Sequence, residues 1–79
     1  MPHLSMSHDA VRHELNGISS LSSQVERDAV ANVVIKLSDG NAWYPDTLRR
    51  ELKSIQAKGT ISEIDRHAVE KKFFPEHAW

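Results

Sequence analysis

Residues 26–37, with the sequence ERDAVANVVIKL, constrain the fold most because their apolar side chains occupy more than one side of a helix. One broad face at helical spacing consists of Ala29, Val30, Val33, Val34 and Leu37. Ala31 and Ile35 add apolar side chains on the other side. A helix of this kind must be covered from two directions. Because the other expected helices carry only narrow apolar stripes, the sequence predicts that a second copy of the chain provides one cover.

The length of the chain also favours association. A chain of 79 residues forms one domain with a small core, whose net stability is only a few kcal/mol unless something else contributes. Disulfides are excluded by the absence of cysteine, which fits a reducing compartment. The chain starts without the basic and apolar regions of a signal peptide, and no run reaches the roughly 20 apolar residues of a membrane span. We expect a cytoplasmic protein without a membrane partner.

Capping residues and chain breakers divide the first half of the chain into two expected helices. Ser7 is placed to cap the first, whose apolar stripe contains Val11, Leu15 and Ile18. A serine-rich linker follows. Ser23 and Glu26 then have the spacing of a capping box, so a second helix is expected to begin there. It should end at Asp39-Gly40, where glycine can adopt the left-handed cap conformation.

Similar signals predict two helices in the second half. Pro45-Asp46 is a favourable entry to a helix with a stripe of Leu48, Leu52 and Ile55, and Gly59 should end it. Thr60 and Glu63 then form a second capping-box pattern. The apolar stripe expected for the last helix is Ile61, Ile64, Ala68 and Phe73. Pro75 should stop that helix.

The expected fold class is therefore all-α, a small bundle of three to four short helices that forms a homodimer. Residues 1–22 are expected to form a short helix and a serine-rich, partly flexible linker. Residues 23–74 form the helical core and dimerisation domain, and residues 75–79 a short tail. The expected dimer interface consists of Val30, Val33, Val34 and Leu37. Ala31 and Ile35 would then receive the third and fourth helices of the same chain, although the two faces could be exchanged.

No motif of a catalytic, cofactor or metal site is found in the sequence. There is no G-x-S-x-G elbow, phosphate-binding glycine loop or cysteine nucleophile, and the serines lie at expected caps and linkers. Glu63 and His67 lie one turn apart, but a metal site would need a further ligand such as His77. The five histidines leave a response to pH open. We therefore expect a protein that is not an enzyme and has no cofactor or metal ion.

Charge is unevenly distributed, although the formal net charge is only −1. Residues 1–46 contain three basic and six acidic side chains, whereas residues 47–72 contain seven basic and four acidic ones. This basic half could contact phosphates or could simply form solvated helix surfaces. The possible nucleic-acid contacts are Arg49, Arg50, Lys53, Lys71 and Lys72. A near-neutral chain favours the second interpretation, because dedicated nucleic-acid binders are usually basic.

Two aromatic residues, Trp43 and Tyr44, lie in the connection before Pro45. Aromatic side chains at such a position can contact a partner protein, or can fix the loop to the core. We favour the core of the chain or of the dimer for Trp43. Tyr44 could serve either purpose.

Residues 24–72 carry a pattern that resembles a known family. Its parts are an acidic start at Glu26, an Ala/Val-rich helix, Asp39-Gly40, a short loop with Trp43, then Leu48 and Leu52, a second turn, and a helix with Asp65, Arg66 and Lys71. This resembles the small enterobacterial biofilm-development and acid-resistance regulators of the YmgB/AriR type. The chain departs from that family at Trp43-Tyr44-Pro45, where the family has more polar residues, and in its Pro-Glu-His-Ala-Trp tail.

The resemblance implies a short helical homodimer that regulates transcription or signalling. Members of the family are described as regulators that bind DNA as dimers, or as connectors to two-component signalling. We expect a non-enzymatic, homodimeric connector that binds a signalling or transcription protein. The alternative is a weak, sequence-tolerant DNA-binding regulator.

Overall fold

The structure, a computed structural model, describes residues 7–21 and 23–77, with the side chain of His8 excepted. These residues form the helices α1 (His8–Asn16), α2 (Gln24–Asp39), α3 (Pro45–Ala57) and α4 (Glu63–Phe73), and contain no strand. The expected all-α class and small bundle are therefore confirmed. No helix within the described residues combines the length and apolar character that a membrane crossing requires.

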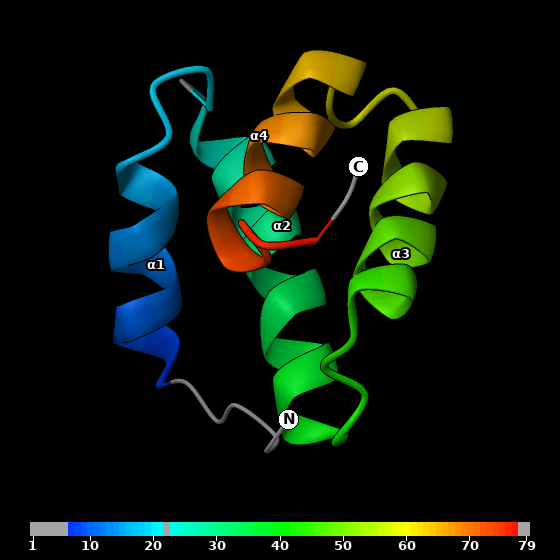
Figure 1. Ribbon diagram of the computed structural model, residues 1–79. Helices are drawn as coiled ribbons and strands as arrows, with labels where there is room; N and C mark the ends of the chain where they lie inside the picture. The colour runs from blue at the N-terminus through cyan, green and yellow to red at the C-terminus, as the bar shows by residue number, and fades with distance from the viewer. Residues whose placement is uncertain (1–6, 22, 78–79) are drawn as a thin grey trace.

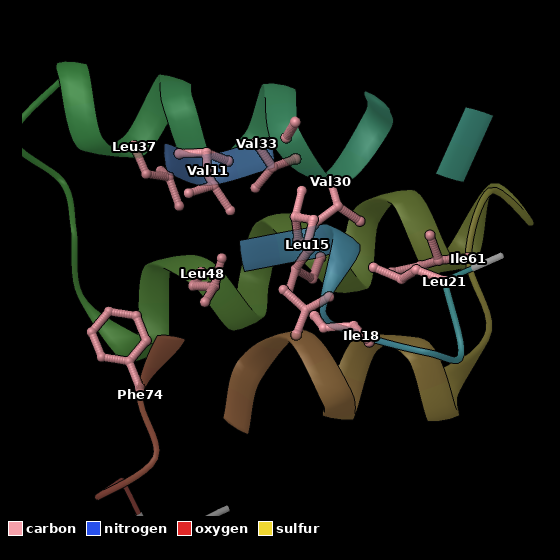
Figure 2. Packing of buried hydrophobic residues seen from close by; sticks show 14 of the residues in the cluster. Val11, Leu15, Ile18, Leu21, Val30, Val33, Leu37, Leu48, Ile61 and Phe74 are labelled. Atoms are coloured by element: carbon pink, nitrogen blue, oxygen red, sulfur yellow. The ribbon is translucent and has the colours of Figure 1, made fainter. Parts of the chain in front are cut away.

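The longest helix, α2, runs through the middle of the bundle (Figure 1). It packs against α1 on one side and α3 on the other, and α4 packs against α3. Figure 2 shows Val30, Val33 and Leu37 pointing from α2 into the space that Leu15 of α1 and Leu48 of α3 also enter. The core therefore lies between α2 and the other three helices.

All four helices and all three connections between them contribute to a single core. Its buried members are Val11, Leu15, Ile18, Leu21, Val30, Ala31, Val33, Val34, Leu37, Trp43, Leu48, Leu52, Ile61, Val69 and Phe74. Residues on both sides of the boundary expected at residue 22 belong to this cluster. Ile18 and Leu21 lie outside α1, in the serine-rich connection, and extend the apolar surface that this part of the chain places against α2.

The structure corrects the dimer interface that we expected on α2. The exposed fraction of Val30, Val33, Val34 and Leu37 is at most 8% in the single chain. Ala31 on the other side is fully buried as well, so both sides are covered without a second copy. The accessible area of 4810 Å² is close to the roughly 4,800 Å² expected for a folded monomer of this mass. A dimer would have to use another surface.

At its carboxyl end, α3 closes with a Schellman motif. Gly59 has a φ of +82°, in the left-handed region. The amide of Gly59 donates to the carbonyl of Gln56 at 2.9 Å, and the amide of Thr60 donates to the carbonyl of Ile55 at 3.0 Å. The expectation that Gly59 ends this helix is confirmed, and its reason is the conformation that glycine adopts without a steric cost.

The end of α2 has the same pattern of bonds, but with a different residue in the left-handed position. Asn41 has a φ of 58°, whereas Gly40 has a φ of −85°. The amide of Ala42 donates to the carbonyl of Leu37 at 2.9 Å, and the amide of Asn41 donates to that of Ser38 at 3.4 Å. The expected left-handed cap at Gly40 is therefore wrong by one residue, since asparagine also tolerates this conformation.

The amino-terminal cap of α1 was predicted correctly, and that of α2 only in part. The Ser7 side chain accepts a hydrogen bond from the amide of Ala10 at 3.1 Å. Ser23 lies at the expected cap position of α2, but its side chain makes no capping hydrogen bond. The capping box expected between Ser23 and Glu26 is therefore not formed.

The start of α4 also differs from the expectation. Ser62, not Thr60, is the cap residue, and its side chain accepts a hydrogen bond from the amide of Asp65 at 3.1 Å. The buried side of α4 is unexpected too, since Ile64 is 74% exposed. Its buried residues are Asp65, Arg66, Val69 and Glu70. A largely charged face is thus packed inward, and Arg66 and Glu70 on it bind each other.

Candidate functional site: an aromatic groove and the adjoining ion network

An apolar groove lies where the beginning of α3 meets the end of α4. Its volume is about 360 Å³. The walls consist of aromatic rings and prolines, and two polar residues of the carboxyl-terminal segment complete the lining. The lining residues are Trp43, Pro45, Phe73, Phe74, Pro75, Glu76 and His77.

The two prolines determine where these walls stand. Pro45 occupies the first turn of α3, where its missing amide hydrogen costs nothing and its fixed φ suits a helix. Pro75 disfavours the helical conformation of the residue before it, and Phe74 accordingly has a φ of −132° and a ψ of 65°. The chain therefore leaves α4 beside the start of α3, and the groove forms between them.

Trp43 forms one wall of the groove. Its ring meets Phe73 edge to face, with centroids 5.5 Å apart and an interplanar angle of 86°, and meets Phe74 at 4.9 Å and 34°. Trp43 is buried in the core of the chain itself, which is one of the two positions we favoured for it. Tyr44, next to it in sequence, is 61% exposed. The site thus combines three aromatic rings that pack against one another with one aromatic side chain, Tyr44, that is exposed to solvent.

Beside the groove, a buried ion network joins α3 to α4. Glu70 has no exposed surface, and Arg66 is 5% exposed. One guanidinium nitrogen, Nη1 of Arg66, donates to Oε1 of Glu70 at 2.9 Å and to Oε2 at 3.0 Å. The Nε of Arg66 donates to Oε1 of Gln56 at 2.5 Å. Since both ions are removed from water, each depends on the other for compensation.

Arg49 belongs to this network instead of to a free basic surface. Its Nε lies 3.9 Å from Oε2 of Glu70. Arg49, which the sequence suggested as a possible phosphate contact, thus lies beside a carboxylate of the chain itself. Arg66 and Glu70 were overlooked, although their spacing of four residues is that of an ion pair on one helix face. Gln56, a further partner of Arg66, is the penultimate residue of α3.

The other candidate phosphate contacts are divided between different surfaces. Arg50 and Lys53 are exposed and lie nearly one turn apart on α3, and Lys71 is exposed on α4. Lys72 instead bridges to α1, with its Nζ 3.3 Å from Oε2 of Glu14. Two of the five cations, Arg49 and Lys72, are therefore engaged by carboxylates of the chain itself.

Glu63 and His67 are the two residues that the sequence suggested as the start of a metal site. His67 does not turn toward a ligand cluster: its Nδ1 lies 3.9 Å from Oε1 of Glu70, and its Nε2 lies 3.5 Å from Nη2 of Arg66. Within residues 7–21 and 23–77, no three His, Asp or Glu side chains are grouped so as to hold a metal ion. The described part of the chain therefore offers the aromatic groove as its more distinctive site.

A second, smaller cleft of about 90 Å³ lies between α1 and the first turns of α2, and polar side chains dominate its lining. Nη1 of Arg12 donates to Oδ1 of Asp28 at 2.7 Å, and Nε2 of Gln24 donates to the same oxygen at 2.9 Å. The bond from Arg12, followed by that from Gln24, holds the pKa of Asp28 below its ordinary value of 3.8. These contacts join α1 to α2, and they occupy the hydrogen-bonding groups that a ligand in the cleft would need.

Comparison with protein families, with curated proteins and with solved structures gives no match to this chain. The functional argument therefore rests on the groove, the surrounding charges and the sequence pattern.

Proposed function

We propose that the protein is a small, non-enzymatic, cytoplasmic regulator that acts by binding another protein in the aromatic groove. It would serve as a connector in bacterial signalling or transcriptional control, as the resemblance to the biofilm and acid-resistance regulators implies. The observation that carries this proposal is an apolar groove walled by Trp43, Phe73 and Phe74 beside the exposed Tyr44.

The groove is suited to anchoring one large apolar side chain of a partner. Its rings are already fixed by contacts within the chain, so little side-chain entropy is lost when the partner binds. Aromatic residues supply much of the free energy at protein interfaces, and the exposed Tyr44, next to Trp43 in sequence, offers a further aromatic contact. The volume of about 360 Å³ lies within the range of pockets that take a small ligand or a side chain.

The two exposed residues Tyr44 and Val25 provide a matched test. Val25 is 71% exposed at the opposite end of α2, roughly 20 Å along the helix from the groove. Photocrosslinking residues at either position, followed by pull-down from a bacterial host, should capture a shared partner only from position 44. Tyr44→Ala should weaken capture by about tenfold or more, as for a hot-spot residue, while Val25→Ala should leave it unchanged. Equal capture or equal loss at both positions would contradict the proposal.

DNA binding is the second candidate, favoured by the exposed pair Arg50 and Lys53 on α3 and by Lys71 on α4. It has less support, since Arg49 and Lys72 face carboxylates of the chain. A retardation assay at low and at physiological salt separates the two functions. Binding that falls steeply with salt and is lost in Arg50→Ala/Lys53→Ala would favour DNA, whereas no retardation at low salt would favour the connector.

A further inference from the structure

The chain turns back on itself directly after α4. The amide of His77 donates to the carbonyl of Phe74 at 3.2 Å, which closes a four-residue turn. Pro75 takes the second position of this turn, where its fixed φ is favourable. Because a turn of this kind brings its first and last residues within about 7 Å of each other, the chain leaves His77 close to Phe74.

The same turn forms one side of the aromatic groove. All four of its residues, 74–77, line the groove together with Trp43 and Pro45. In Figure 1 the segment that follows α4, drawn in red, runs toward α3, to which Pro45 belongs. The chain therefore passes residue 77 at the wall of the groove itself.

The next two residues in the sequence are Ala78 and Trp79, which lie beyond the described residues. Two residues span at most about 7 Å, so the backbone of Trp79 stays near the groove in any conformation of the chain. Neither side chain is charged, and an indole offers a large, flat apolar surface that suits a groove walled by aromatic rings. The sequence thus places a matching aromatic side chain within reach of the groove.

Covalent attachment gives this side chain an advantage over a free one. A short tether provides an effective concentration in the millimolar range. Phe73 and Phe74 already pack against Trp43, so the walls are formed before anything enters. Even a weak affinity of the groove for an indole would therefore keep it filled in most molecules.

We propose that the side chain of Trp79 occupies the aromatic groove of its own chain and closes it as an internal ligand. The regulatory consequence rests on the proposed function: a protein partner that uses the groove has to displace Trp79. The apparent affinity of that partner is then reduced by the fraction of molecules in which the groove is open. The end of this chain thus acts as a competitor of the partner.

Nuclear Overhauser effects in the full chain test the occupancy directly. In the wild type, the indole protons of Trp79 should show effects to the side chains of Phe73 and Pro45, and these signals should be missing in Trp79→Ala. Ile64→Ala is the matched control, because it removes an exposed apolar side chain at the other end of α4 and should keep these effects. A Trp79 indole without effects to any residue of the groove would overturn the proposal.

Free indole, used as a probe, tests whether the groove is already filled. At millimolar concentration, indole should shift the ring signals of Phe73 and Phe74 in Trp79→Ala, where the groove is open. In the wild type and in Ile64→Ala, indole should bind about fivefold or more weakly, because Trp79 competes for the same site. Equal binding by all three proteins, or no binding by Trp79→Ala, would contradict the proposal.

Neither measurement involves a protein partner, so this inference and the proposed function can fail separately. Failure to capture a partner from position 44 would overturn the connector and leave the occupancy of the groove standing. If both hold, Trp79→Ala should increase capture from position 44, while Ile64→Ala should not. Capture that is unchanged in Trp79→Ala would contradict the competition.

Discussion

Removing Glu70 should destabilise the protein strongly, because its carboxylate is the partner of a buried cation. Glu70→Leu fills a similar volume with apolar atoms but leaves the guanidinium of Arg66, 5% exposed, with Gln56 as its remaining close acceptor. Two hydrogen bonds of 2.9 and 3.0 Å are lost. Breaking a buried ion pair by removing one partner costs about 3–5 kcal/mol.

This loss is large for a chain of 79 residues. At about 0.05–0.15 kcal/mol per residue, the free energy of unfolding is of the order of 4–12 kcal/mol. Glu70→Leu should therefore leave the chain marginally folded or unfolded at room temperature. Urea unfolding followed by helical circular dichroism measures the loss, with the destabilised variants examined in a stabilising osmolyte.

The double variant Arg66→Met/Glu70→Leu separates ionic compensation from simple packing. It removes both charges together, and Arg49 can extend its partly exposed guanidinium into water. The double variant should be within about 1 kcal/mol of the wild type or more stable, so the two substitutions should be coupled by about 3 kcal/mol or more. A Glu70→Leu loss below about 1 kcal/mol, or a double variant as unstable as the single one, would refute the reasoning.

Two further predictions concern a helix cap and an exposed ion pair. Ser62→Ala should reduce the free energy of unfolding by about 1 kcal/mol, because Ser62 caps α4. Thr60→Ala, at the position where the sequence suggested the cap, should change the free energy of unfolding by only about a few tenths of a kcal/mol. A larger loss for Thr60→Ala than for Ser62→Ala would contradict the assignment of the cap. The lowered pKa of Asp28 means that its bonds to Arg12 and Gln24 stabilise the fold above pH 3.8, and that this contribution is lost as the pH falls through the folded pKa. In urea unfolding, Asp28→Asn should therefore be less stable than the wild type at about pH 5, and the difference should narrow below pH 3.8. A difference that is constant with pH would argue against the pairing.

The helices could be predicted from the sequence because their limits depend mainly on local chemistry. Ser7 caps α1 through an amide three residues away, and Pro45 and Gly59 define the limits of α3 through their own backbone preferences. The same kind of reasoning was wrong by one residue at Gly40 and by two at Thr60. Neighbouring residues there offered equally suitable chemistry, and the path of the chain decided between them.

The inward face of α4 could not be predicted in this way. A hydrophobic pattern favours Ile64 as a core residue, yet Arg66 and Glu70 are buried instead. Their burial depends on Gln56 and Arg49 of α3, which reach them only in the folded bundle. The groove has the same origin, since Trp43 and Phe73 meet only when the ends of α3 and α4 are brought together.

The cover of α2 shows a related limit. Ile18 was counted in the stripe of the first expected helix, but Leu21 was left out of the count because it lies in the serine-rich connection, where the structure places both residues. Both are buried in the core, so the connection acts as part of the cover. The width of the apolar surface on α2 was correctly recognised, but it did not require a second copy of the chain.

The first two turns of α2 combine two carboxyl groups whose responses to acid are opposite. Glu26, with a raised pKa, contributes stability that is full below pH 4.5 and is lost as the pH rises through its folded pKa. Asp28, with a lowered pKa, contributes stability that is full above pH 3.8 and is lost as the pH falls through its folded pKa. Both contributions are at their full value together only between these limits. The combined contribution of these two carboxyl groups to stability should therefore be largest in mildly acidic solution.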